Sequence, residues 1–125
     1  MRLLLAGWPR AGKSTLAAEL SQAHGWPVRH TDDLIHLGWS EASAAAALWL
    51  DAPGPWIIEG VAVPRAVRKW LAAHPTGCPA DEAHYLAAPY LPLSSGQAAM
   101  GRGCDSVWRE VAAPLRARGV RVVDG

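Results

Sequence analysis

The fold of this chain is decided by residues 2–24, which read RLLLAGWPRAGKSTLAAELSQAH. The apolar run Arg2–Ala6 is typical of a buried strand, and the apolar spacing within Lys13–His24 predicts a helix. Between them, Gly7–Gly12 carries the glycines and proline of a tight loop. The segment therefore predicts a strand, a loop and a helix in direct succession.

The loop has the composition of a phosphate-binding site. Residues 7–14 (GWPRAGKS) match the pattern G-x-x-x-x-G-K-[ST] completely. In such a loop, backbone N–H groups surround phosphate oxygens at a helix N-terminus. Lys13 then places its charge against the β- and γ-phosphates, and the Ser14 hydroxyl is a ligand for Mg²⁺. We expect ATP or another nucleoside triphosphate to contact Gly7, Trp8, Pro9, Arg10, Ala11, Gly12, Lys13, Ser14 and Thr15.

The rest of the chain alternates strand-like and helix-like segments. Strands are expected over residues 28–30, 56–59, 83–87 and 120–123, and helices over residues 40–51, 64–74 and 105–118. Ser40 is expected to cap the second helix, Pro114 to kink or divide the last one, and residues 89–103 to be irregular. This alternation predicts an α/β fold of three layers, with a mostly parallel five-stranded sheet, in a single domain over residues 1–125.

Composition excludes several classes of protein. The formal net charge is +1, with 12 basic and 11 acidic residues, so bulk charge alone cannot drive binding to nucleic acid, although a local basic patch could. Cys78 and Cys104 have neither the spacing of a zinc site nor that of a redox motif. No apolar stretch approaches the length of a membrane span, so we expect a cytoplasmic protein without a membrane partner.

An acidic pair, Asp32 and Asp33, follows the second expected strand. In a parallel sheet, it emerges at the same edge as the phosphate loop. A carboxylate there can accept the proton of an attacking hydroxyl. The alternative is that Thr31 or one aspartate caps the next helical turn, and the two roles are compatible.

The stretches GWPRAGKSTLAAEL (residues 7–20) and HTDDL (residues 30–34) resemble the small kinases of the P-loop NTPase superfamily. The closest resemblance is to the 5′-polynucleotide kinase branch, with its G-x-P-x-x-G-K-S-T loop and Asp-Asp pair. This resemblance implies that Asp32 is the general base. In the shikimate- and adenylate-kinase relatives, acidic residues of this region serve the acceptor or Mg²⁺, which makes Asp33 a candidate for such a role. It is specific over residues 1–35, moderate to about residue 72 and thin beyond.

Two further segments fit this resemblance. Residues 56–60 (WIIEG) have the apolar-run-then-acid form of a Walker B strand, so Glu59 is a candidate for holding Mg²⁺ or contacting the acceptor. Arg65 and Arg68 are similar to the arginine region of nucleoside monophosphate kinases. Their spacing places them on one helix face, where they could bind an acceptor phosphate or simply form a solvated basic face.

The resemblance also implies a lid over the phosphates. The equivalent region, Leu91–Cys104, contains Arg102 between two glycines, and Arg102 is our candidate for stabilising transition-state charge. This lid would be minimal, so we expect an open acceptor site or one completed by a partner or a homo-oligomer.

Together these features predict an ATP- and Mg²⁺-dependent kinase that phosphorylates a hydroxyl of a nucleic acid or nucleotide. The favoured acceptor is DNA, at a 5′-hydroxyl or a 5-hydroxymethylpyrimidine, as for a small phage-type DNA kinase. One alternative is a nucleoside monophosphate or small-metabolite kinase. The other is an ATP-hydrolysing or ATP-binding switch module.

Overall fold

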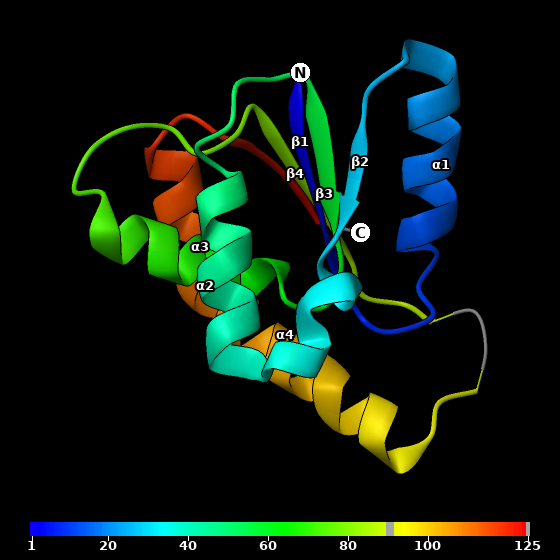
Figure 1. Cartoon of the computed structure of the whole chain (residues 1–125). Helices are drawn as coiled ribbons and strands as arrows, with labels where there is room; N and C mark the ends of the chain where they lie inside the picture. Colours follow the sequence, from blue (N-terminus) through cyan, green and yellow to red (C-terminus); the bar gives the residue numbers. More distant parts are fainter. Residues whose placement is uncertain (90–91, 125) are drawn as a thin grey trace.

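The centre of the fold is a sheet of five strands in the spatial order β2-β3-β1-β4-β5 (Figure 1). The computed structural model describes residues 1–89 and 92–124. The strands are β1 (Arg2–Gly7), β2 (Val28–His30), β3 (Trp56–Glu59), β4 (Glu82–Leu86) and β5 (Arg121–Asp124). The sequence predicts a mostly parallel sheet, and all four pairings are parallel. Helical crossovers connect consecutive strands, because parallel strands cannot be joined by a short hairpin.

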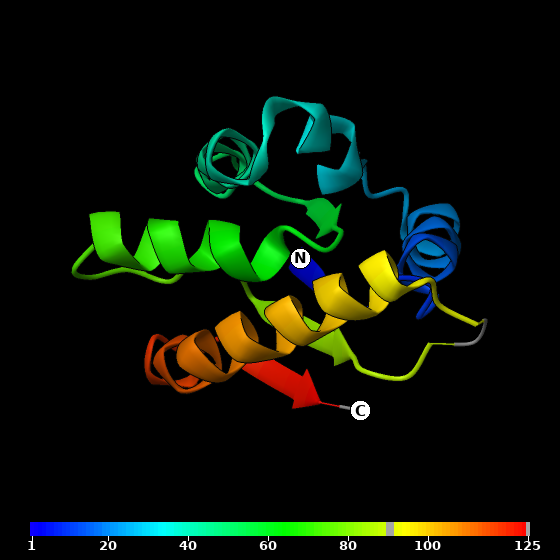
Figure 2. The same ribbon diagram turned by 90° about the horizontal axis from the view of Figure 1, so that it is seen from below.

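Helices cover both faces of this sheet, as the sequence predicts for an α/β fold (Figure 2). Helix α1 (Lys13–His24) lies on one face. Helices α2 (Trp39–Trp49), α3 (Val63–Ala73) and α4 (Ser95–Ala117) lie on the other. Strand β1 is buried on both faces: Leu3 and Leu5 pack toward α1, and Leu4 belongs to the larger core beneath the other helices. A central strand between two helical layers accordingly reads as one continuous apolar run.

Strand β4 has a mixed apolar and polar sequence, unlike the continuous apolar run of β1. Tyr85 is buried and stacks on Trp108 of α4, with ring centroids 5.0 Å apart. On the opposite face, Glu82 and His84 are only partly buried, and His84 Nε2 lies 2.6 Å from Glu82 Oε1. One face of β4 is therefore apolar, whereas the other carries Glu82 and His84 beside Leu86, although the strand lies inside the sheet.

The largest difference from the sequence-based expectation concerns residues 89–103. They were expected to be irregular, but α4 begins at Ser95 and contains Gly101 and Arg102 in its interior. Ser94 forms a capping box with Gln97: Gln97 N donates to Ser94 Oγ at 3.1 Å, and Ser94 N donates to Gln97 Oε1 at 3.0 Å. This pair satisfies two N–H groups at the helix start and offsets the low helix propensity of the glycines. The glycine-flanked loop expected over 91–104 is therefore a helix over residues 95–104, and Leu91 lies outside the described residues.

Three smaller expectations also need correction. Helix α2 begins at Trp39, one residue before the expected cap Ser40, and its N-cap is Gly38, with φ of 89°. Thr31 and Asp32 do not cap the next turn, because the short 3-10 helix η1 (Thr31–Leu37) has His30 as its N-cap. Pro114 does not divide α4, which continues to its end at Ala117.

Within the described part of the chain, no helix is both long enough and apolar enough to cross a membrane.

Candidate active site

The loop Gly7–Ser14, which the sequence predicts to bind phosphate and which is called the phosphate loop below, connects β1 to α1 at the carboxyl edge of the sheet. Its first glycine has φ of 139°, and a Cβ there would lie 2.1 Å from the carbonyl oxygen of Leu86. The next residue, Trp8, donates its N–H to the same carbonyl at 2.9 Å. Gly12, with φ of 89°, then begins α1. Glycines are needed at both positions, because both have left-handed backbone and Gly7 lies against β4.

Lys13 lies inside this loop. It is 7% exposed, and its Nζ donates hydrogen bonds to the carbonyl oxygens of Trp8 at 2.5 Å and Gly7 at 3.3 Å. Burial lowers the pKa of Lys13, while the nearby carboxylates of Glu59 and Asp32 act in the opposite direction. The loop therefore holds an ammonium group beside two acidic side chains.

Glu59 is the most deeply buried of these acids, with 2% exposure. Its Oε1 accepts hydrogen bonds from Ser14 Oγ at 3.3 Å and from His30 Nδ1 at 2.5 Å. The sequence points to Ser14 and Glu59 but does not single out His30. The sequence places His30 at the end of a strand, as it does Glu59. This identifies His30 as a partner of Glu59 only when the strand order, with β2 beside β3, is known.

A cavity of about 620 Å³, called the main cavity below, joins these elements. This size falls within the range of small-molecule sites, about 300–1,000 Å³. Eight of the expected site residues line it: Pro9, Arg10, Gly12, Lys13, Ser14, Thr15, Asp32 and Glu59. Four further lining residues were not expected from the sequence: Ile35, Val61, Gln97 and Met100. The phosphate loop, η1, the end of β3 and the start of α4 thus surround one space.

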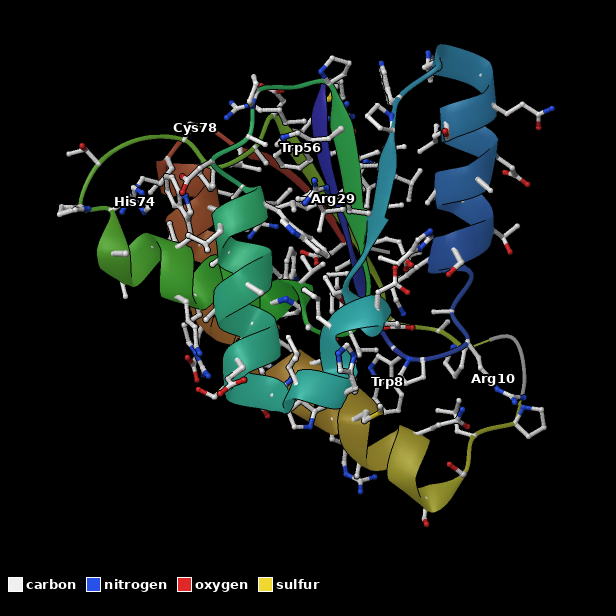
Figure 3. The ribbon with its side chains drawn as sticks, in the orientation of Figure 1. Trp8, Arg10, Arg29, Trp56, His74 and Cys78 are labelled. Atoms are coloured by element: carbon white, nitrogen blue, oxygen red, sulfur yellow. The ribbon has the colours of Figure 1, made fainter. Side chains whose placement is uncertain are left out.

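Trp8 connects the loop to α4 and does not line the main cavity (Figure 3). Its Nε1 donates to Asp105 Oδ1 at 2.8 Å, and Asp105 also accepts a hydrogen bond from the Tyr85 hydroxyl. The Trp8 ring lies against Gly101, where a Cβ would be 2.1 Å from ring atom Cε3. Burial, followed by the bond to Asp105, raises the pKa of Tyr85. Trp8 therefore packs on the helix that supplies Gln97 and Met100 to the cavity.

The arginines expected to bind the acceptor do not line the main cavity. The Arg65 guanidinium lies 4.6 Å from the centre of the Trp39 ring, and its buried NH1 has no hydrogen-bond partner among the described residues. Arg68 is exposed and lies 3.3 Å from Glu110. Their different contacts do not form the shared clamp suggested by their spacing.

Two other expected site residues lie outside the lining. Arg102 is exposed on α4, in a regular helix and not in the glycine-flanked loop that was expected. Asp33 is exposed on η1 and does not line the cavity, whereas Asp32 does. Of the acidic pair, the structure therefore brings Asp32 to the phosphate loop.

The side chains near the loop suit a hard cation that takes most of its ligands from substrate phosphates and water. Ser14, Glu59 and Asp32 supply oxygen atoms, which Mg²⁺ prefers. The described residues contain no cluster of three or more His, Cys, Asp or Glu side chains that could hold a metal ion by itself. This donor set fits Mg²⁺, which is usually bound by one or two carboxylates together with substrate phosphates and water.

No protein-family model matches the chain, and no curated protein sequence matches it. Its function therefore has to be inferred from the residues around the main cavity.

Proposed function

We propose that this chain is an ATP- and Mg²⁺-dependent kinase of the P-loop type, which transfers the γ-phosphate to a hydroxyl of a nucleic-acid or nucleotide acceptor. One observation carries this proposal: five residues of the phosphate loop line the same cavity of about 620 Å³ as Asp32 and Glu59, namely Pro9, Arg10, Gly12, Lys13 and Ser14. That cavity would hold a triphosphate and a candidate base together, as phosphoryl transfer requires.

The triphosphate would bind to the loop and the start of α1. Backbone N–H groups and the helix dipole favour anions at this position. Lys13 would exchange its carbonyl contacts for contacts with β- and γ-phosphate oxygens. Ser14 and Glu59, already hydrogen-bonded to each other, would hold Mg²⁺, which neutralises charge on the phosphates.

Asp32 would act as the general base. It lies on η1, lines the main cavity and is exposed, so its carboxylate is accessible to an acceptor hydroxyl. It would accept the proton as the hydroxyl oxygen attacks the γ-phosphorus, and the bond from that phosphorus to the β–γ bridging oxygen would break.

The acceptor is proposed to be DNA, at a 5′-hydroxyl or a 5-hydroxymethylpyrimidine. Ile35, Val61 and Met100 give the cavity an apolar wall, which suits the face of a nucleobase. Arg102 stays a candidate for contacting the acceptor strand from the exposed side of α4.

A nucleoside monophosphate or small-metabolite kinase is the second candidate, and Arg65 favours it. A buried guanidinium nitrogen without a partner is costly, and an anionic group on the acceptor would satisfy it. Reaching it would require Trp39 to move from the guanidinium face.

The test is transfer of label from γ-labelled ATP to a panel of acceptors: DNA with a 5′-hydroxyl, DNA with 5-hydroxymethylpyrimidines, nucleosides, nucleoside monophosphates and small metabolites. The proposal expects labelled DNA. Label only in monophosphates or metabolites supports the second candidate, and release of inorganic phosphate alone supports a switch module. A protein that does not bind ATP refutes all three.

A further inference from the structure

The buried carboxylate of Glu59 depends on two hydrogen bonds to one oxygen. Ser14 Oγ and His30 Nδ1 both contact Oε1, at 3.3 Å and 2.5 Å respectively. No other described side chain makes a hydrogen bond with Glu59. A carboxylate with 2% exposure requires such partners, because burying an unpaired charge is costly. His30 makes the shorter of the two contacts.

The strand register explains why His30 reaches Glu59. His30 on β2 and Glu59 on β3 are paired Cα positions, so their side chains lie next to each other on the same face of the sheet. On the other side of Glu59, the paired residue is Leu5 of β1, which is apolar and fully buried. Of the two residues paired with Glu59 on the neighbouring strands, His30 is therefore the one that can hold the carboxylate in place by a hydrogen bond. An ionised carboxylate only accepts hydrogen bonds, so Nδ1 is the donor.

His30 itself does not line the main cavity. Together with Ser14, Gln22 and Val28, it borders a separate cavity of about 350 Å³ between α1 and β2. Its side chain is 43% exposed, whereas that of Glu59 is almost fully buried. Its hydrogen bond to Glu59, which does line the main cavity, is the contact through which His30 can act on chemistry there.

We infer that His30 is a positioning residue: it holds the Glu59 carboxylate toward Ser14 and the main cavity and so sets the affinity of the site for Mg²⁺. The inference rests on the proposed function, because it assigns Glu59 to the cation. Partners that orient metal ligands commonly change metal affinity or activity by about 10- to 100-fold when they are removed. A purely structural His30 would instead change stability and leave the Mg²⁺ dependence as it is.

The experiment measures binding of a fluorescent ATP analogue, first in EDTA and then across a titration with Mg²⁺. For His30→Ala we expect unchanged affinity in EDTA, because the phosphate loop is intact. The Mg²⁺ concentration at half-maximal response should rise about 10-fold or more. His30→Asn retains a side-chain N–H close to the position of Nδ1 and should restore most of the wild-type Mg²⁺ dependence.

His84→Ala is the matched control. His84 also contacts a glutamate within the sheet, with Nε2 at 2.6 Å from Glu82 Oε1, but neither residue lines the main cavity. It should leave the Mg²⁺ titration unchanged. A His30→Ala titration equal to that of wild type, or an equal shift in His84→Ala, overturns the inference about His30 alone. A wild-type protein that does not bind the analogue overturns the proposed function and this inference together.

Discussion

Replacing Gly101 by alanine should destabilise the protein, although alanine is the better helix former. The new Cβ would lie 2.1 Å from Cε3 and 2.3 Å from Cδ2 of Trp8, too close for any real contact. The indole cannot shift freely, because its Nε1 is hydrogen-bonded to Asp105 at 2.8 Å. The substitution therefore acts on the connection between the phosphate loop and α4.

The magnitude follows from three effects. Overpacking costs about 1–3 kcal/mol. Displacing the indole also loses a hydrogen bond to a charged acceptor, worth about 1.5–3 kcal/mol. The higher helix propensity of alanine returns about 1 kcal/mol. We therefore expect the free energy of unfolding to fall by about 2–4 kcal/mol, since contributions of neighbouring groups are not fully additive.

Urea denaturation followed by far-UV circular dichroism measures this change. The midpoint should fall by about 1–2 M, given a denaturant slope of about 2 kcal/mol/M. Gly103→Ala is the control in the same helix, because its Cβ would meet a single terminal nitrogen of Arg65 at 2.9 Å, where Gly101 meets a whole indole ring. It should stay within about 1 kcal/mol of wild type, on the stabilised side. If Gly101→Ala is as stable as Gly103→Ala, the packing of Trp8 on α4 is refuted.

Four further predictions concern the cap of α4, the buried tyrosine and, in two cases, the arginines. Ser94→Ala removes the capping box and should lower the free energy of unfolding in urea by about 0.5–2 kcal/mol; no loss would contradict the helix start. The pKa of Tyr85 is raised above its ordinary value of 10.0, so the unfolded chain loses this proton before the folded chain does. The free energy of unfolding should therefore decline as the pH rises above 10. Its difference between wild type and Tyr85→Phe should shrink between pH 8 and 11. A difference that stays constant would contradict the raised pKa of Tyr85. Arg68→Ala should change stability by less than about 1 kcal/mol, because its contact with Glu110 is exposed. If phosphorylated acceptors are used, Arg65→Ala should raise their KM and Arg68→Ala should leave it unchanged. Equal increases in KM would instead indicate that both arginines bind the acceptor phosphate.

Much of the fold could be predicted because local sequence and tertiary structure agree. The apolar run of β1, the glycines of the loop and the spacing of α1 all specify a strand, a turn and a helix. The acids also lie as expected: Asp32 follows β2 and Glu59 is the last residue of β3, and the carboxyl ends of parallel strands meet at one edge of the sheet.

The start of α4 was missed because its composition and its capping signal disagree. Residues 89–103 are rich in Pro, Gly and Ser, which favours an irregular segment. The pair Ser94-x-x-Gln97 is nevertheless a capping-box pattern and marks the helix start. The packing of Trp8 against Gly101 supplies a tertiary contact that no local pattern contains.

Contacts between elements account for the remaining differences. Arg65 and Arg68 have the spacing of one helix face, but Trp39 and Glu110 determine where their guanidinium groups lie. The pairing of His30 with Glu59 depends on β2 being the neighbour of β3. Helical or strand periodicity does not encode such neighbours, because strand order is a property of the whole fold.

The most direct test of the proposed kinase is the Asp32→Asn variant, measured in parallel for ATP affinity and for transfer of labelled phosphate to the acceptor that wild type uses. The substitution preserves shape but removes the base, so ATP affinity should be unchanged while transfer falls by about 10²–10⁴-fold. Transfer at the wild-type rate would contradict the assignment of Asp32 as the general base, and a wild-type protein that binds ATP but labels no acceptor would contradict the kinase itself.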